Sequence, residues 1–245
     1  MRGRRAIVGG MALLALAACD VPPPPAPAGA PPVLSAAPVA PKLAPEVAAR
    51  TFVEVVARLE PVAEAECRVR RGGNCDFLIA VDEEAGDQVN AFQTLDPDGR
   101  PAIVFTPGLI AEARNADELA FVLGHEAAHH IEDHIPQTQQ QARSGALLAG
   151  LAAAVLTSGA DPTTQQSVID QALRAGAFVG ARRYSKEHEL EADALGTVIT
   201  KRGGYDPLRG ALFFERLPDP GDEFLGSHPR NADRLATVRR VAAGL

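Results

Sequence analysis

The sequence predicts an α+β fold in which a small three-stranded sheet is followed by many helices. Two observations predict this fold class. Short apolar segments with strand character occur between residues 77 and 106, where the turn sequence Asp96-Pro97-Asp98-Gly99 separates the last two of them. From residue 107 onward, apolar residues recur at helical spacing. Strands that precede a run of helices, instead of alternating with them, are typical of the α+β class.

The first 18 residues have the pattern of a bacterial signal peptide. Arginines at positions 2, 4 and 5 precede an apolar run over 6–18, and Leu16-Ala17-Ala18-Cys19 resembles a lipobox. We therefore expect residues 1–18 to be removed and Cys19 to carry the lipid that anchors the chain to a membrane. An ordinary secretory cleavage and a short membrane anchor are the alternatives, but the apolar run is shorter than the ~20 residues that a span needs.

Residues 19–45 are rich in proline and alanine, a composition that predicts an extended tether. The remaining residues, 46–245, are enough for one domain with a substantial core. The net charge of the chain is −7, and loss of the three arginines of the signal peptide would bring it to −10. An acidic chain without basic runs argues against nucleic acid as a partner.

The domain is predicted to begin with a helix over 46–70, since apolar residues recur there every three or four positions. Cys67 lies near the end of this helix, and Cys75 follows a Gly-Gly-Asn turn. In an oxidising compartment we expect the two cysteines to form a disulfide that closes the connection between the helix and the first strand. Two unpaired thiols or a metal site with two cysteines are the alternatives.

Strands are predicted over 77–81, 89–94 and 102–106, and helices follow over 107–113, 116–134, 138–157, 163–182, 186–201, 207–216 and 230–243. Asn115 and Glu118 form a capping-box pattern at the start of the second of these helices. The most apolar part of the mature chain, 145–157, would extend only ~20 Å as a helix. It predicts a buried helix or a surface that touches the membrane, because a span needs ~30 Å.

The helix over 116–134 carries the most informative motif, His125-Glu126-Ala127-Ala128-His129. Two histidines four residues apart lie on one face of a helix, so both imidazoles can reach a single metal ion. The glutamate between them can take a proton from a water molecule at that metal, as in zinc-dependent hydrolases. A helix that carries these residues on its surface without a function is the alternative.

A catalytic zinc takes three protein ligands, so a third one is expected. His134 is one residue out of phase with the metzincin motif, and His130 projects about 100° away from His129 around the helix, so both are predicted to be surface residues. A carboxylate is the better candidate, and one carboxylate could bind zinc while another orients a ligating histidine. Spacing alone does not choose among the glutamates of the segment Ser185-Lys186-Glu187-His188-Glu189-Leu190-Glu191-Ala192-Asp193.

These motifs together resemble those of the HtpX/CAAX-prenyl-protease-type zinc metallopeptidases. The resemblance rests on HEAAH, an apolar helix after it, ELEAD at 189–193, Ser227-His228-Pro229 ahead of Arg234, and Asn90-Ala91-Phe92, and it covers residues 75–240. Lipoprotein and periplasmic members of the BepA and LoiP kind and mitochondrial Oma-type proteases look most similar. The integral members carry transmembrane helices around the motif that this chain lacks, so their membrane-embedded substrates are not implied.

The resemblance implies a gluzincin-type metallopeptidase domain that binds one Zn²⁺ per chain, with the sheet at the active-site cleft. It makes Glu189 the third zinc ligand beside His125 and His129, Asp193 the carboxylate that orients a ligand, and Glu126 the base. By the same resemblance, Asn90, Ala91 and Phe92 border the cleft and could pair with an extended substrate backbone. His228 would approach the metal as a switch or polarise the substrate carbonyl, unless it is a loop histidine without a role.

The sequence thus predicts a zinc metalloendopeptidase that hydrolyses misfolded or misassembled proteins of the bacterial cell envelope. The lipobox predicts a lipoprotein that faces the periplasm, on either the inner or the outer membrane. A chaperone or assembly factor for envelope proteins, in which proteolysis is secondary or gated, is the alternative. A structural lipoprotein with a vestigial site is a third possibility, which the intact ligand set disfavours.

Overall fold

The structure is a computed structural model that describes residues 40–182, 185–218 and 229–245. The chain divides into two units, residues 1–39 and 40–245, and the fold described below is that of the second. The expected signal peptide, the lipidated Cys19 and most of the expected tether lie outside the described residues, as does His228.

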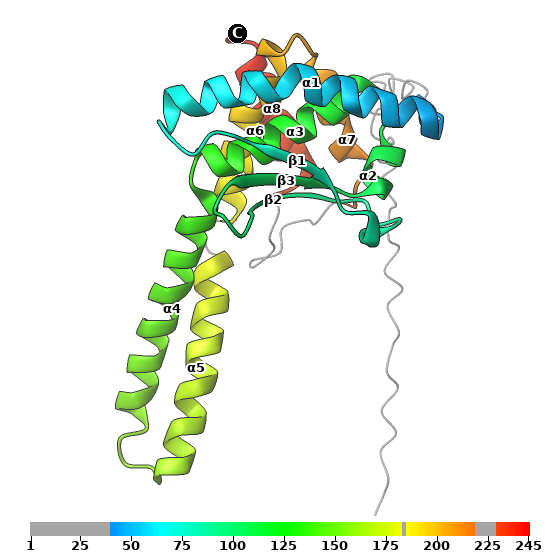
Figure 1. Cartoon of the computed structure of the whole chain (residues 1–245). Helices are drawn as coiled ribbons and strands as arrows, with labels where there is room; N and C mark the ends of the chain where they lie inside the picture. Colours follow the sequence, from blue (N-terminus) through cyan, green and yellow to red (C-terminus); the bar gives the residue numbers. More distant parts are fainter. Residues whose placement is uncertain (1–39, 183–184, 219–228) are drawn as a thin grey trace, which may run out of the picture. The chain divides into compact units, whose positions relative to one another are not determined.

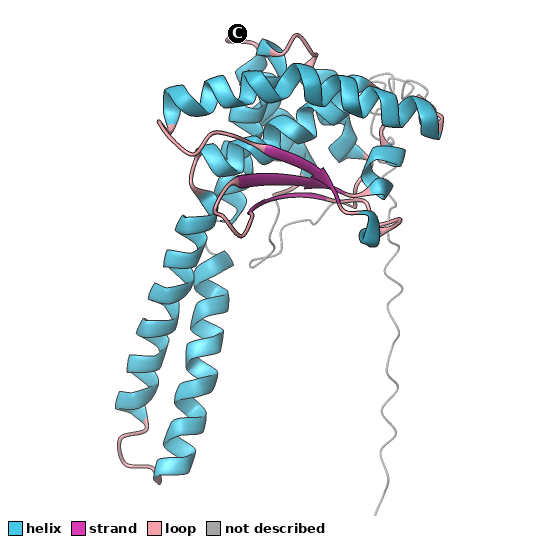
Figure 2. Cartoon of the chain, in the orientation of Figure 1, coloured by secondary structure: helices cyan, strands magenta, loops and turns pink. Residues whose placement is uncertain are grey.

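The sheet has three strands, β1 (Leu78–Val81), β2 (Ala91–Leu95) and β3 (Pro101–Phe105), in the order β1-β3-β2. Strand β3 lies in the centre, parallel to β1 and antiparallel to β2 (Figure 2). The predicted turn between β2 and β3 forms at 96–99, where the Asp96 carboxylate accepts hydrogen bonds from the backbone N–H groups of Asp98 and Arg100 at 2.9 and 2.8 Å. The predicted three-stranded sheet is therefore confirmed, and β2 forms one of its edges.

Eight helices are described around this sheet: α1 (Pro45–Arg70), α2 (Pro107–Glu112), α3 (Ala116–Ile131), α4 (His134–Leu156), α5 (Pro162–Arg182), α6 (Ser185–Arg202), α7 (Pro207–Glu215) and α8 (Asn231–Ala242). Helix α3 is the central one, since it packs against α1, α6, α7 and the sheet (Figure 1). Its N-terminus is capped as predicted, because the Asn115 side chain accepts a hydrogen bond from the N–H of Glu118 at 3.1 Å. This arrangement confirms the α+β class.

The hydrophobic core lies between α1, the sheet and α3. Val55 and Leu59 of α1, Ile103 of β3, and Leu123 of α3 are fully buried in it, as is Phe105 at the end of β3. The side chains of α3 are buried almost all around the helix, since elements cover it on several sides. Any residue on α3 that faces a neighbouring helix is therefore held in a fixed position.

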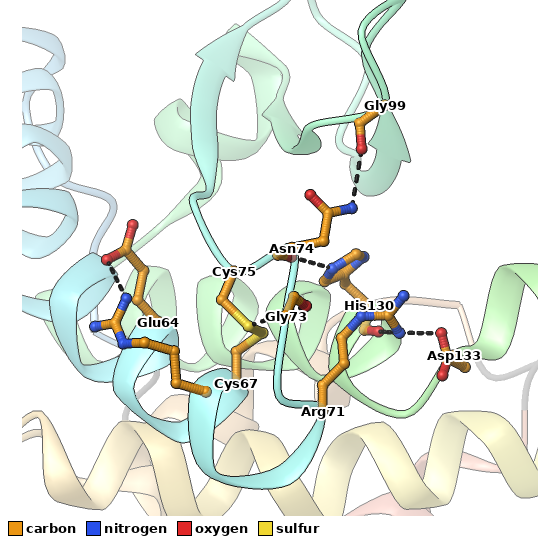
Figure 3. The surroundings of a disulfide bond; sticks show 10 residues. Glu64, Cys67, Arg71, Gly73, Asn74, Cys75, Gly99, His130 and Asp133 are labelled. Carbon is orange, nitrogen blue, oxygen red and sulfur yellow. Dashed lines mark hydrogen bonds and ion pairs between the residues drawn. A yellow bond between two sulfur atoms is a disulfide. The ribbon is translucent and has the colours of Figure 1, made fainter.

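The helix predicted over 116–134 ends earlier, at Ile131, and the next helix begins at His134 instead of the predicted 138. Asp133 adopts left-handed backbone angles, φ 58° and ψ 31°, which end the α3 geometry and start α4 in a new direction. Asp tolerates this conformation better than most residues. Arg71 holds the break in place, because its guanidinium pairs with the Asp133 carboxylate and donates a hydrogen bond to the carbonyl of His130 at 3.0 Å (Figure 3). The sequence predicted the break between the two helices at 135–137, whereas the structure has it at 132–133, because the left-handed conformation of Asp133 leaves no periodic signal.

Cys67 and Cys75 form a disulfide, with their Cα atoms 5.6 Å apart. It joins the last turn of α1 to the segment that enters β1, next to Arg71 (Figure 3). Both cysteines are buried.

Helices α4 and α5 pack against each other as an antiparallel hairpin (Figure 1). They approach closely at glycines, since a Cβ on Gly145 would lie 2.2 Å from the carbonyl oxygen of Gly176. Of the two alternatives predicted for the apolar segment 145–157, the buried helix was wrong, because the outer side of α4 is exposed at Leu147, Leu148, Leu151, Val155 and Leu156; a surface that touches the membrane stays a prediction. Among the described residues, no helix combines the length and the apolar character needed to cross a membrane.

A glycine pair sets the distance between α3 and α6. A Cβ on Gly196 would lie 2.9 Å from the backbone nitrogen of His125, so an alanine there must push the two helices apart. We expect Gly196→Ala to lower the free energy of unfolding by ~1–3 kcal/mol, the usual cost of overpacking, in denaturant titrations. The matched control is Gly159→Ala between α4 and α5, where an added Cβ meets nothing within 4 Å. Equal stability of the two variants would contradict the assigned packing.

Candidate metal centre

Three helices supply the residues of the site. Helix α3 supplies His125, Glu126 and His129, helix α6 supplies Glu189 and Asp193, and helix α8 supplies Arg234. The spacing of four residues puts the two histidines one turn apart on the side of α3 that faces α6, and the two carboxylates one turn apart on α6. The close approach at Gly124 and Gly196 then brings these two faces into contact.

His125, His129 and Glu189 converge so that their ligand atoms lie within 4.8 Å of one another. The Nε2 atoms of the two histidines are 3.1 Å apart, and each lies 3.5 Å from one carboxylate oxygen of Glu189. Ligands about 2.0–2.1 Å from a tetrahedral zinc would lie about 3.3 Å from one another. The two nitrogens and the carboxylate therefore fit a zinc ion in both donor type and spacing.

Asp193 and Arg234 lie next to the triad formed by His125, His129 and Glu189. The Asp193 carboxylate is completely buried, 2.9 Å from Nδ1 of His125, and it accepts two hydrogen bonds from the Arg234 guanidinium at 2.8 and 2.7 Å. The guanidinium in turn lies over the ring of Phe214, with Cζ 3.3 Å from the ring centroid. Asp193 thus lies beside His125, a predicted ligand, and Arg234 is a contact of Asp193 that the sequence did not predict.

Glu126 lies in the same cavity as the triad but is not one of its three members. It faces the edge strand, since the backbone of Gln93 in β2 favours its ionised form and lines the same cavity. Burial raises the pKa of Glu126 to about 7, since the nearby charges of His125 and Glu189 act in opposite directions. A carboxylate with such a pKa is well suited to exchange protons near neutral pH.

The two histidines are in contrasting electrostatic environments. Burial opposes protonation of His125, but hydrogen bonds to Asp193 and Glu189 outweigh it and raise its pKa to about 9. Burial and the positive charge of His125 lower the pKa of His129 to about 3. The protein groups alone therefore favour a proton on one imidazole, and a cation that binds both nitrogens must displace it.

The prediction that His130 and His134 are surface residues was wrong, because 5% and 3% of their surfaces are exposed. Nε2 of His130 lies 2.7 Å from the carbonyl oxygen of Asn74, away from the triad. His134 instead reaches the site, with its Nδ1 2.9 Å from Nδ1 of His129. On a continuous helix, His134 would project about 140° away from His129, so the break at Asp133 brings the two rings together.

The triad opens into a cavity of about 750 Å³. One wall is the edge of the sheet, where Asn90, Ala91, Phe92 and Gln93 line the cavity. Other walls come from α6, α7 and the start of α4, including Phe213, Phe214, His188 and Thr138. The structure thus places the three predicted substrate-binding residues in the same cavity as the predicted ligands. The helical pattern gave no reason to single out His188, which is buried beside His134.

The fold and the site together define a metallopeptidase. The model of peptidase family M48 matches residues 59–242, and the chain belongs to this family. This membership confirms the resemblance seen in the sequence and the assignment of the chain as a hydrolase of peptide bonds.

Relatives of the chain include bacterial and mitochondrial proteins. The beta-barrel assembly-enhancing protease of Escherichia coli is 28% identical over 164 residues, which are 64% of this chain and 33% of the relative. A similarly named protein of Vibrio cholerae is 33% identical over 143 residues, which are 55% of this chain and 29% of the relative. The mitochondrial metalloendopeptidase OMA1 of Saccharomyces cerevisiae is 27% identical over 163 residues, 59% of this chain and 44% of the relative. The matches thus span less than half of each relative.

Proposed function

We propose that the protein is a zinc-dependent metalloendopeptidase that cleaves misfolded or misassembled proteins of the bacterial envelope. The observation that carries this proposal is the convergence of His125, His129 and Glu189 beside Glu126, in a cavity that one edge of the sheet borders. A chain with only a structural role would have no reason to bury this set of polar groups around an accessible cavity.

His125, His129 and Glu189 would hold the metal ion. When bound, zinc would supply a Lewis acid that polarises the substrate carbonyl and makes a water molecule more acidic. Glu126 takes a proton from the attacking water and passes it to the leaving amine, so that the peptide bond breaks and a carboxylic acid and an amine form. Asp193 accepts a hydrogen bond from Nδ1–H of His125, which leaves Nε2 of that ring for the metal.

The edge strand β2 is the proposed binding site for the substrate backbone. Its hydrogen bonds to β3 use one side of the strand, and β2 is at the end of the described sheet. An extended peptide that lies along Asn90, Ala91 and Phe92 would pass the triad and bind mainly through its backbone. Its hydrogen bonds would go to Ala91, because the N–H and the carbonyl of Asn90 already bond to Thr106. Such pairing would give affinity with little sequence preference, which suits a protease for misfolded chains. In this proposal His228 acts on the substrate carbonyl or as a switch at the metal.

The envelope location rests on the lipobox at Cys19 and on the bacterial relatives. A chain anchored there by a lipid, with a disulfide between Cys67 and Cys75, would belong to an oxidising compartment outside the cytoplasm. An assembly factor that binds envelope proteins without cutting them is the second candidate. The name of the Escherichia coli relative, which refers to beta-barrel assembly, favours it.

Metal removal tests the proposal directly. We expect purified protein to contain about one zinc ion per chain, as a three-ligand site implies, and to digest an unfolded protein substrate. A chelator should abolish digestion, and added Zn²⁺ should restore it, as peptide mass spectrometry of the digest would show. A zinc content well below one ion per chain after zinc supplementation, or digestion that survives complete metal removal, would refute the proposal.

A further inference from the structure

His134 is a buried polar residue that the proposed mechanism does not use. Its ring is almost fully buried, although it occupies the first position of α4, directly after the left-handed residue Asp133. It is stacked on His188, with ring centroids 4.4 Å apart and an angle of 12° between the planes. Buried imidazoles need partners for both ring nitrogens, so the contacts of these nitrogens define what His134 can do.

Each nitrogen of His134 has one partner. Nδ1 lies 2.9 Å from Nδ1 of His129, and Nε2 lies 3.1 Å from a carboxylate oxygen of Glu191. A carboxylate only accepts hydrogen bonds, so Nε2 of His134 must donate to Glu191. In a neutral ring, Nδ1 of His134 is then an acceptor, and Nδ1–H of His129 is its donor. This is the one arrangement of a neutral pair that satisfies both contacts.

The arrangement fixes the tautomer of His129 in the form that a metal requires. A proton on Nδ1 leaves the lone pair of Nε2 free, and Nε2 is the atom that faces His125 and Glu189. His125 is held in the same way from its Nδ1, by the carboxylate of Asp193 at 2.9 Å. Each of the two histidines thus has its own hydrogen-bond partner at Nδ1, which keeps Nε2 free for a metal. The partner of His125 is a carboxylate, and the partner of His129 is a histidine that is itself bonded to a carboxylate.

We propose that His134 is a positioning residue for the metal site. Its ring orients the His129 ring and links it, through hydrogen bonds, to the Glu191 carboxylate. This inference rests on the proposed role of His129 as a metal ligand. The Glu191 side chain is 60% exposed while His134 is buried, so the chain of hydrogen bonds runs from solvent to the ligand. Removal of such outer partners typically weakens metal affinity 10- to 100-fold.

Zinc affinity, measured by competition with a chromophoric chelator, tests this role separately from activity. We expect His134→Leu to weaken zinc binding about 10- to 100-fold. His134→Asn can present its side-chain oxygen to Nδ1–H of His129, so it should recover most of the affinity. Glu191→Ala, an exposed change that leaves the core intact, should weaken binding in the same direction by a smaller factor. Absorption spectra of Co²⁺-loaded protein should shift in His134→Leu and return towards the wild-type form in His134→Asn.

The matched control is His130→Leu, which removes another buried histidine from the end of α3 with a contact away from the site. It should lower stability to a comparable degree without changing the affinity of the folded protein for zinc. If His134→Leu fails to fold, the zinc affinities of His134→Asn and Glu191→Ala still test the inference. Wild-type affinity in Glu191→Ala together with equal losses in His134→Asn and His130→Leu would overturn the inference. A wild-type protein that binds no zinc would instead refute the proposed function.

Discussion

Replacement of Glu126 by glutamine should leave zinc bound and nearly abolish cleavage. Glutamine keeps the size of the side chain and can still contact the backbone of Gln93, but it cannot accept the proton of the attacking water. A general base contributes ~10²–10⁴-fold to a rate. We therefore expect the rate of cleavage of an unfolded protein substrate to fall by at least ~10²-fold. Zinc content by elemental analysis should stay near the wild-type value, since Glu126 is not one of the three converging ligands.

The same variant separates the protease from the assembly factor. In a strain that lacks the protein, Glu126→Gln should fail to restore the phenotype if cleavage is the function, and the uncleaved substrates should accumulate in its envelope proteome. Glu132→Gln, on a half-buried residue that directly follows α3, is the control and should behave as wild type. Full complementation by Glu126→Gln would favour binding over cleavage. Unimpaired digestion by that variant would refute the mechanism.

Replacement of Arg234 by leucine should strongly destabilise the domain. The guanidinium makes two hydrogen bonds with Asp193 and lies over Phe214, and all of these contacts are buried. Leucine would leave the Asp193 carboxylate buried beside His125 without its cationic partner. Breaking a buried pair in this way typically costs ~3–5 kcal/mol. Chemical denaturation should show this loss, and zinc affinity should fall because Asp193 no longer has a fixed position.

The loss of stability in Arg234→Leu should become smaller at low pH. Burial tends to raise the pKa of Asp193, but the charge and hydrogen bonds of Arg234 outweigh it and hold the pKa below the ordinary value of 3.8. The stabilisation is therefore complete above pH 3.8 and disappears as the pH falls through the lower folded-state pKa. The difference between wild type and Arg234→Leu should thus be largest at neutral pH. Arg230→Leu, which alters an exposed pair with Asp233, should cost at most ~1 kcal/mol, and a similar cost for both variants would contradict the argument.

Much of the fold could be predicted because local signals and the final structure agree. The turn at 96–99, the Asn115 cap and the change from strand to helix patterns near residue 107 depend on neighbours in the sequence, and the structure forms all of them. The residues of HEAAH could be recognised for the same reason, since a spacing of four residues on a helix fixes their relation. Glu189 needed the family resemblance, because three glutamates at alternate positions offered similar spacing.

The environment of the second histidine could not be predicted in this way. His134 lies five residues after His129, a spacing that separates side chains on a continuous helix, and only the left-handed Asp133 brings their rings together. That conformation depends on Arg71, which is distant in sequence and is positioned beside a disulfide. Arg234 is likewise brought to Asp193 by the packing of α8 on α6. Contacts of this kind are set by tertiary structure and leave no periodic signal.

The α4–α5 hairpin also has a consequence for the entropy of folding. His129 and Glu189 are far apart in the chain, and nearly all of the residues between them belong to the hairpin. Joining two such points through a flexible loop of about 60 residues would cost ~4 kcal/mol, and a loop of about a dozen residues costs ~2 kcal/mol. Because the hairpin is antiparallel, its two ends lie close together. The entropy cost of bringing His129 and Glu189 together is then that of a loop of about a dozen residues, and not that of a loop of about 60. The length of the hairpin can then change by matched turns of α4 and α5 while the ligand atoms keep their positions.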